Sequence, residues 1–544
     1  MRVKRILLAI PALLAALLAA TLLFVSVRAQ PGLNQLVISS IGDASYLNPV
    51  LAQDSASSEV NGFVFNGLLK YDRDLKRLVG DLAESWEVRE DERPEIVFHL
   101  RRGVRWHDGA PFTADDVKFT YERIMDPKTN TVRRADYELV DKVEVIDPYT
   151  VKVTYREPFS PGLDTWGIGI IPRHLLEGED INTARFNSQP VGTGPFRFAQ
   201  WASDEKIVLA ANPDYWEGRP HLDRIIIRII PETSLSEIEL LTGGIDLYGV
   251  EPHQYARIGA DPRLEVFSQP SLGYTYIGWN LQNPLFRDAR VRRAMAMAVD
   301  REEIVRYVLY GLGRVATGPF PYHMWYANPH VAPLPYDPEG ARRLLAEAGW
   351  RPGPDGILTK NGERFSFRLI TNAGNDVRRD VGVLVQRQLS QLGIEVRLEL
   401  YEWAVFLKDF INPRHFDATI LGWSLSVDPD CYNIFHSSQI KEGFNFTSYA
   451  SPEADRLMEA GRREYDREER RRIYWRLHEV IAADQPYLFL FVPTGSAALR
   501  HRFALLETAD GERRLVPITM HKAGLTYDII KWTALPPGRP VLEQ

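Results

Sequence analysis

Few side chains in this sequence stand at spacings that support chemistry. The 12 histidines occur singly, from His99 to His521, and none has another four residues away, the spacing that places two metal ligands on one helix face. The one cysteine, Cys431, can form neither an intramolecular disulfide nor a zinc site that needs two cysteines. The motifs of serine hydrolases, zinc proteases, phosphate loops and dinucleotide sites are missing. We therefore expect no cofactor and no enzymatic activity, and only a metal site assembled from distant residues stays open.

The adjacent carboxylates Asp115 and Asp116 are the remaining candidates for catalysis. Two acids that flank a glycosidic bond can hydrolyse it. This pair, however, follows Thr113 at the start of a helix predicted over 114–124. A hydroxyl there caps the first-turn amides, and carboxylates interact favourably with the helix dipole. The pattern favours a structural role.

Hydrophobic periodicity predicts a β-rich first part and an α/β second part that begins near residue 287. In the first part we expect strands at 35–40, 82–88, 96–100, 143–146, 151–155, 196–201, 207–211, 225–230 and 245–250, and helices at 60–68, 114–124 and 234–241. In the second part we expect helices at 289–298, 301–309, 338–348, 376–392, 452–465 and 467–483, and strands at 364–370, 395–401, 418–422 and 487–492. This alternation predicts a separate doubly wound lobe.

Length, composition and charge exclude several classes of protein. A chain of 544 residues predicts about three structural units, at roughly 100 to 200 residues each. Hydrophobic residues at 45% and charged residues at 25% are typical of globular proteins. Acidic residues outnumber basic ones 72 to 65, so the sequence has no basic footprint for nucleic acid. A run of seven arginines between 462 and 476 alternates with acidic residues, which favours a solvated helix face.

The first 29 residues have the pattern of a secretory signal peptide. Arg2, Lys4 and Arg5 precede a mostly apolar run over 6–27, and small residues follow for cleavage after Ala29. The run is also long enough to span a bilayer as an uncleaved anchor, but we favour cleavage. No cysteine in this segment can carry a lipid. We expect the mature protein to be an unlipidated periplasmic monomer.

A set of short segments is spread across nearly the whole mature chain. They are Tyr46-Leu47-Asn48-Pro49, Phe65-Asn66-Gly67-Leu68, Leu82-Ala83-Glu84-Ser85-Trp86, the block 98–117, Gly192-Thr193-Gly194-Pro195-Phe196, Asn212-Pro213-Asp214-Tyr215-Trp216, the block 288–294, Ala298-Val299-Asp300-Arg301, Gly422-Trp423 and Asp455-Arg456-Leu457. In type and order they resemble the extracellular solute-binding proteins of family 5. Members of that family are the receptors of ATP-driven importers for dipeptides, oligopeptides and, in some cases, nickel.

The resemblance implies an α/β, bilobal periplasmic-binding-protein-like fold, with two α/β lobes joined by two crossover strands and an extra inserted domain. The implied boundaries are 1–29 for the signal peptide, 31–75, 190–284 and 500–544 for lobe I, 76–189 for the inserted domain II, and 285–499 for lobe III. Closure of the lobes about a hinge would bury the ligand. The implied partners are a small solute, in first place a short peptide, and an ABC permease complex in the membrane.

The ligand-binding candidates follow from their positions in the family and in the predicted elements. They are Gln53, Asp54, Ser55, Tyr276, Asn280, Trp403, Trp423, Ser424, Ser426 and Asp428. The loop 53–55 corresponds to a family loop that contacts ligand from lobe I, with a polar turn as the alternative. Alternation puts Tyr276 and Asn280 on one strand face and Trp279 in the core. Trp423 follows the strand 418–422 at its carboxyl end, where open α/β sheets place ligands.

The segment after Trp423 departs from the peptide-binding members. Many of them have an aspartate three residues after the tryptophan that neutralises the peptide's α-ammonium, whereas this chain has Ser426 and is one residue shorter. A buried ammonium needs a partner. Asp428, biased toward an extended backbone by the following proline, is the nearest substitute, and Asp54 is the second. Alternatively, Asp428 or Asp430 caps a helix that starts near residue 432.

The departure from the family pattern is compatible with several ligands and with several classes of protein. We favour a peptide over an oligosaccharide, for which aromatic platforms and neutral polar groups suffice, and both over nickel. An exported hydrolase that acts on the same solutes is the alternative from another class. A membrane-anchored sensor with the same fold would require the segment 6–27 to persist.

Overall fold

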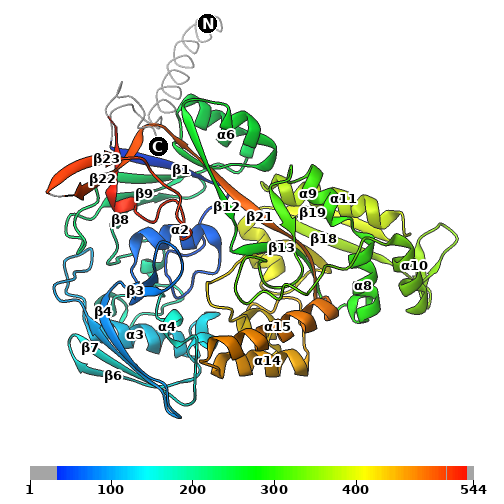
Figure 1. Cartoon of the computed structure of the whole chain (residues 1–544), viewed down its shortest axis with the longest axis horizontal. Helices are drawn as coiled ribbons and strands as arrows, with labels where there is room; N and C mark the ends of the chain where they lie inside the picture. The colour runs from blue at the N-terminus through cyan, green and yellow to red at the C-terminus, as the bar shows by residue number, and fades with distance from the viewer. Residues whose placement is uncertain (1–33, 510, 536–544) are drawn as a thin grey trace, which may run out of the picture.

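The computed structural model describes residues 34–509 and 511–535 of the chain. The expected signal peptide at 1–29 and the two outer ends of lobe I therefore lie outside the described residues. The largest element is a 12-stranded sheet that extends through both halves of the molecule (Figure 1). Within the described residues, no helix combines the length and hydropathy that a membrane span requires.

One half of the large sheet is built on the first strand of the chain, and we refer to this half as lobe I. β1 pairs in parallel with β10, and β9 and β8 continue the sheet in antiparallel fashion. The bounds are β1 (Gln35–Ser40), β8 (Phe196–Ala202), β9 (Lys206–Ala211), β10 (Arg224–Ile229) and β11 (Leu247–Gly249). Alternate residues of β9 are buried, as the period-2 pattern of the sequence predicts. Lobe I also holds α2 (Ser55–Val64), α6 (Thr233–Thr242) and α7 (Tyr255–Gly259).

The other half, which we refer to as lobe III, is an α/β unit. Its strands are β14 (Gly313–Val315), β18 (Ser366–Asn372), β19 (Glu395–Tyr401) and β20 (Ala418–Ser424). β18 pairs in parallel with both β19 and β20. Its helices are α8 (Ala289–Ala298), α9 (Arg301–Tyr307), α10 (Pro338–Glu347), α11 (Asp376–Ser390), α12 (Trp403–Val405), α13 (Tyr432–Phe435), α14 (Pro452–Arg463) and α15 (Arg467–Asp484). The α/β alternation predicted for the second part of the sequence is therefore present.

Two passages of the chain connect the lobes. β12 (Leu264–Pro270) and β13 (Gly273–Trp279) lead from lobe I into lobe III, and β21 (Tyr487–Arg500) leads back. β21 pairs with β11 and β12 at one end and with β13 and β14 at the other. It is 14 residues long, whereas the sequence pattern predicted a strand that ends at 492. The extra length makes it a crossover strand, which crosses the molecule as the long orange strand of Figure 1.

A second sheet forms the inserted domain beside lobe I. Its order is β4-β5-β7-β6, with all neighbours antiparallel. The bounds are β4 (Ala83–Arg89), β5 (Glu95–Leu100), β6 (Val140–Asp147) and β7 (Thr150–Tyr155), and the helices are α3 (Ala114–Met125), α4 (Gly162–Thr165) and α5 (Arg173–Leu176). Thr113 and Asp116 form the capping box of α3, which confirms the structural role predicted for this carboxylate.

Three small sheets complete the described chain. They are the pair β2 (Leu69–Tyr71) and β3 (Leu78–Gly80), the set β15 (Arg351–Pro352), β16 (Leu358–Lys360) and β17 (Glu363–Arg364), and the set β22 (Phe503–Ala509), β23 (Glu512–Val516) and β24 (Trp532–Ala534). Lobe I and the inserted domain share one hydrophobic core cluster, and lobe III holds two others. Ala135 of the inserted domain belongs to one of the lobe III clusters, so the two halves also meet through apolar contacts.

Candidate functional site

Lobe III touches the inserted domain through α14. The guanidinium of Arg462 donates to the Glu138 carboxylate at 3.3 Å and to the Ala135 carbonyl at 3.1 Å, both in the inserted domain. It also pairs with Asp430 of its own lobe at 2.9 Å, and it lies 3.8 Å from the ring centre of Tyr432. Arg462 is only 3% exposed. We name this contact the distal rim.

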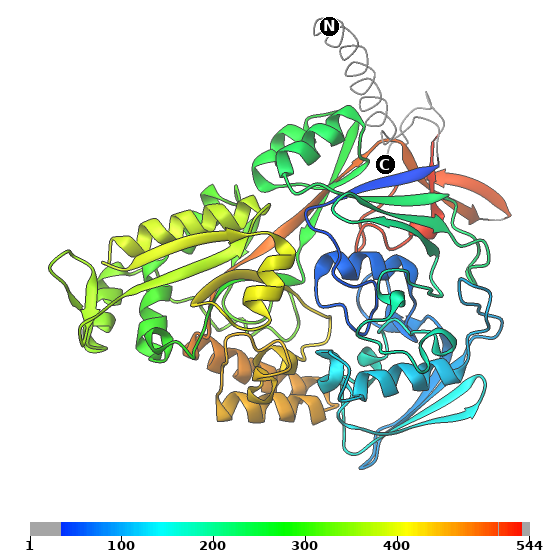
Figure 2. The same ribbon diagram turned by 180° about the vertical axis from the view of Figure 1, so that it is seen from behind.

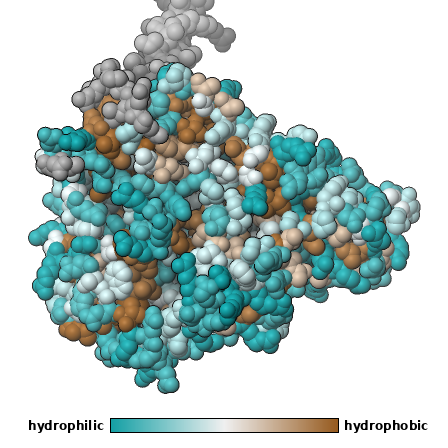
Figure 3. Space-filling model, in the orientation of Figure 1, coloured by the Kyte–Doolittle hydropathy of each residue, from teal (hydrophilic) through white to brown (hydrophobic). Residues whose placement is uncertain are grey.

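Lobe III touches lobe I at a second boundary, the proximal rim. The Thr233 hydroxyl, at the start of α6, donates to the Asp376 carboxylate at the start of α11 over 2.5 Å. The indole of Trp403 packs against Gly42, so closely that a β-carbon on Gly42 would lie 3.1 Å from the ring. We call the region between the two rims, at the boundary of lobe III with lobe I and the inserted domain, the interlobe space. In Figure 2 the blue helix α2 lies near this boundary, and Figure 3 shows brown apolar residues among hydrophilic ones on the face drawn in Figure 1.

An aromatic cluster from three lobe III segments stands on one side of this space. Trp423, at the end of β20, stacks on Phe446 with ring centres 5.9 Å apart and on Tyr276 at 6.2 Å. Its indole N–H donates to the Tyr487 hydroxyl at 3.3 Å. Trp423 stays half-exposed, whereas Tyr276 is 1% exposed beneath it. Trp423 is therefore partly buried at the end of β20, and the buried Tyr276 packs against its ring.

Arg378, in the first turn of α11, lies beside the aromatic cluster. Its guanidinium donates to the Asn372 side-chain oxygen at 2.8 Å and lies over Gly422, the residue before Trp423. Burial lowers the pKa of Arg378 to about 10, and the neighbouring Tyr276 and Glu251 act in the opposite direction. Burial likewise raises the pKa of Glu251, across the boundary, to about 7, and Asp376 raises it further. Sequence analysis did not single out either residue.

The candidates from lobe I lie at the start of α2. Gln53 and Ser55 are exposed, and Asp54 is the N-cap residue, whose carboxylate accepts from the Ser57 backbone N–H at 2.8 Å and from its hydroxyl at 2.7 Å. This cap makes α2 begin at Ser55, five residues before the predicted start, because it satisfies first-turn amides. Asp54 is 6% exposed and fully engaged. It has no free oxygen directed at a ligand.

Asp428, predicted as the substitute ammonium partner, is engaged as well. Its two carboxylate oxygens accept from Arg470 at 2.6 and 2.8 Å, and both side chains are 8% exposed. An incoming ammonium would have to displace a buried bidentate arginine, so we do not carry Asp428 into the proposed site. The neighbouring Asp430 accepts from the backbone N–H of Tyr432 at 3.1 Å. Tyr432 begins α13, whose N-cap residue is Cys431, so Asp430 contacts the first amide of this helix without being its N-cap.

The structure gives the remaining candidates different surroundings. Asn280 donates to the carbonyls of Phe416 and Arg414 at 2.9 and 3.2 Å and so ties two lobe III loops together. Trp279 is fully buried, as alternation predicted. Ser424 and Ser426 are exposed, and the Ser426 hydroxyl donates to the Asp428 carbonyl at 2.9 Å.

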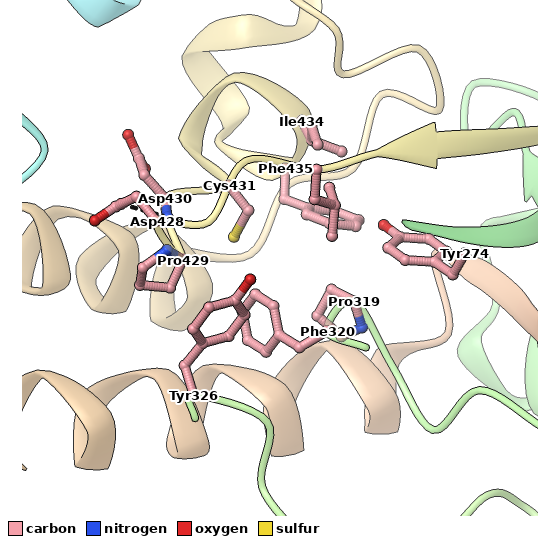
Figure 4. Close-up of a pocket in the computed structure, with 11 residues that line it drawn as sticks. Tyr274, Pro319, Phe320, Tyr326, Asp428, Pro429, Asp430, Cys431, Ile434 and Phe435 are labelled. Atoms are coloured by element: carbon pink, nitrogen blue, oxygen red, sulfur yellow. Dashed lines mark hydrogen bonds between the residues drawn. The ribbon is translucent and has the colours of Figure 1, made fainter. Parts of the chain in front are cut away.

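A small cavity lies behind the 428–431 segment inside lobe III. The sulfur of Cys431 and the hydroxyl of Tyr326 point into it, whereas the carboxylates of Asp428 and Asp430 point away (Figure 4). It has room for about one water molecule. This cavity is too small to hold a peptide.

The arginine run of α14 and α15 is only partly a solvated face. Arg463, Arg471, Arg472 and Arg476 carry exposed ion pairs. Arg462 and Arg470 are instead 3% and 6% exposed. The prediction of a wholly solvated face is wrong for these two, because their partners Asp430 and Asp428 come from a loop 32 and 42 residues away.

α2 also carries a charged residue that sequence analysis missed. Glu59 is exposed on this helix, yet desolvation by the surrounding protein raises its pKa to about 7. The predicted helix began at residue 60, which left Glu59 outside it. A capped start at Asp54 would have placed it on the helix.

Comparisons with known proteins agree with this architecture. The model of the bacterial extracellular solute-binding proteins, family 5, matches residues 77–445. The chain is 37% identical over 510 residues to the oligopeptide-binding protein AppA of Bacillus subtilis, with 91% of each chain covered. The solved structure of that protein in complex with a nonapeptide superposes with a TM-score of 0.86 at 36% identity, over 93% of this chain and 100% of the other. NikZ of Campylobacter jejuni in complex with Ni(L-His) has a TM-score of 0.82 at 28% identity, over 92% and 99%.

Proposed function

Because the chain belongs to the family 5 bacterial extracellular solute-binding proteins, we propose that it is the substrate receptor of an ABC importer. It captures a peptide between its two lobes and delivers it to a permease complex in the membrane. The observation that carries this proposal is the division of the molecule into two lobes that are joined by crossover strands, with the partly buried Trp423 cluster on lobe III. Such lobes can close on a solute about a hinge.

A peptide is preferred over a sugar or a nickel complex. Two relatives with extensive coverage are named as oligopeptide-binding and dipeptide-binding proteins. Trp423 offers a large, rigid apolar face, and Ser424 and Gln53 offer neutral hydrogen-bonding groups. A peptide main chain needs this mixture of contacts. The receptor performs no chemistry on the bound molecule.

The proposed site consists of Gln53, Ser55, Trp403, Trp423 and Ser424, with Tyr276 supporting Trp423. The proposed domain boundaries remain 31–75, 190–284 and 500–544 for lobe I, 76–189 for domain II and 285–499 for lobe III. We further propose that the segment 1–29 is removed on export. The mature chain then works as an unlipidated monomer in the periplasm.

Native mass spectrometry of the purified mature protein tests the function. We expect co-purified peptide, released on denaturation and identified by fragmentation. Incubation with a pool of di- to nonapeptides should raise the melting temperature and leave the peptides intact. Turnover of the pool would support the exported hydrolase, and a bound saccharide would support the sugar receptor.

A further inference from the structure

The inserted domain contacts lobe III through its main chain as well as through side chains. The backbone N–H of Ser160 donates to the carbonyl of Arg462 in α14 at 2.6 Å. The backbone N–H of Phe159 donates to the hydroxyl of Tyr465, just after α14, at 3.1 Å. Figures 1 and 2 both show α14 beside the inserted domain, at the end of the molecule away from α6. This contact crosses the boundary between the two halves of the molecule.

Arg462 is the central residue of the contact. Its guanidinium lies over two aromatic rings, 5.3 Å from the ring centre of Phe159 in the inserted domain and 3.8 Å from that of Tyr432 in lobe III. It pairs at the same time with Glu138 of the inserted domain and with Asp430 of lobe III. Because a planar guanidinium can stack and donate together, separation of the two parts would break several of its contacts at once.

Side chains of the inserted domain also enter lobe III. Ala135 is 4% exposed and belongs to a core cluster of lobe III that includes Tyr432 and Phe435. The next residue, Asp136, accepts from the Asn433 amide of α13 at 2.6 Å. Burial of side chains from one part in the core of another stabilises a single relative position of the two parts.

We propose that the inserted domain is a clasp, which holds lobe III in the closed position before any ligand has bound. The inserted domain shares its core with lobe I, so a lobe III that is attached to the inserted domain is also closed on lobe I. This inference goes beyond the proposed receptor function, because it assigns a role to the inserted domain and does not depend on the chemistry of the solute. Arg462 is a positioning residue in this role, which requires no contact with a ligand.

A clasp of this kind changes the binding of every solute by the same factor. When the closed form is already populated, the solute does not have to supply the free energy of closure. The apparent dissociation constant then equals the intrinsic constant divided by the closed fraction. A weaker clasp lowers the closed fraction and so weakens the binding of all solutes equally. A residue that touches the solute acts unequally, because its contacts differ from one solute to the next.

Asn433→Asp tests the clasp at pH 8. The substitution is isosteric and places a second carboxylate against Asp136, whose pKa burial raises to about 6, so both groups are charged at this pH and repel each other. The control is Asn361→Asp, which adds the same charge to an exposed turn of lobe III. Small-angle X-ray scattering is measured on protein freed of ligand by unfolding and refolding. We expect a larger radius of gyration for Asn433→Asp and the wild-type value for Asn361→Asp.

Ala135→Leu weakens the same contact without a charge, because it adds volume where the alanine is already buried. Titration calorimetry measures the consequence for binding with two probes, penta-alanine and a nonapeptide of serine and leucine. We expect Asn433→Asp and Ala135→Leu each to weaken both probes by one common factor, about tenfold for the charged variant. Asn361→Asp should leave both affinities unchanged. Far-ultraviolet circular dichroism checks that each variant is folded.

The possible results separate the clasp from the receptor function. An equal radius of gyration for the wild-type protein and both clasp variants would overturn the clasp. A ligand-free wild-type protein with a radius of gyration larger than that of the closed structure would overturn it as well. Unequal weakening of the two probes would also contradict it, since it would place the substituted residues in contact with the ligand. If the wild-type protein bound neither probe, the peptide function would fail, and the scattering results would still decide the clasp.

Discussion

The two sides of the interlobe space differ in whether their carboxylates have ion-pair partners. On the lobe III wall, Asp428 and Asp430 are locked by Arg470 and Arg462 behind an aromatic cluster. On the lobe I wall, α2 presents Glu59 without a partner among the described residues. A paired charge fixes conformation, whereas an unpaired one is available to a ligand. The paired carboxylates of lobe III therefore stabilise the fold of that lobe.

The largest expected effect concerns the buried ion pair of Asp428 with Arg470 in lobe III. Asp428→Asn should lower the free energy of unfolding by about 3 to 5 kcal/mol, because it leaves the buried Arg470 guanidinium without its counter-charge. Urea unfolding measures this loss. The control is Glu469→Gln, which breaks an exposed ion pair with Arg472 on the same helix and should cost less than about 1 kcal/mol. A normal unfolding curve with lost peptide affinity would return Asp428 to the binding site.

The next prediction compares two adjacent arginines of α14 that both reach the inserted domain. Arg462 is 3% exposed, whereas the Arg463 side chain is 45% exposed in its pair with Glu157. Arg462→Ala should favour the open form by about 2 to 3 kcal/mol, because it removes the donors to the Glu138 carboxylate and the Ala135 carbonyl across the distal rim. Arg463→Ala should change closure by less than about 1 kcal/mol.

Small-angle X-ray scattering without ligand measures this difference. We expect a larger radius of gyration for Arg462→Ala and a wild-type value for Arg463→Ala. Equal behaviour of the two variants would show that the distal rim does not hold the lobes together.

A substitution in the aromatic cluster of lobe III should have a smaller effect, and this effect is on binding. Trp423→Ala should weaken peptide affinity by about 1 kcal/mol or more, because the ligand loses a ring face. The lobe should stay folded, since Trp423 is half-exposed. Trp279→Ala, at a fully buried position, should instead lower the free energy of unfolding by about 3 to 5 kcal/mol. Melting curves and titration calorimetry on both variants separate the roles, and a collapse of Trp423→Ala would assign that residue to the core.

The fold could largely be predicted where the sequence pattern is local. β19 and α8 occupy the predicted ranges, because their periodicity and flanking residues lie within a few positions of each other. β21 was predicted too short, since its second part is held by pairing with β12, more than 200 residues earlier in the chain. Periodicity carries no information on such long-range pairing.

The site was less predictable for the same reason. The exposed position of Trp423 at the end of β20 follows from a general rule of α/β sheets, and its role in binding stays a prediction. The burial of Arg462 depends on Glu138, 324 residues away in sequence, so an alternating charge pattern could not reveal it. Glu59 was missed because the predicted start of α2 lay beyond it, although Asp54 was already available as a cap. Assigning that cap first would have placed Glu59 on the helix.

The smallest effect is a pH dependence of lobe closure. At the distal side, burial and the Asp428 charge raise the pKa of Asp164 to about 7, and burial raises the pKa of Asp136 to about 6. Both values exceed the ordinary value for aspartate, so the closed form binds protons more tightly than an open form in which these groups are hydrated. Closure without ligand should therefore strengthen as the pH falls from 8 to 5.5, by less than about 1.4 kcal/mol per pH unit for each group. The radius of gyration should shrink over this range. Asp164→Asn should reduce the part centred near pH 7, to which Glu251 also contributes, and should leave the part centred near pH 6. Lobes that open on acidification would contradict the prediction.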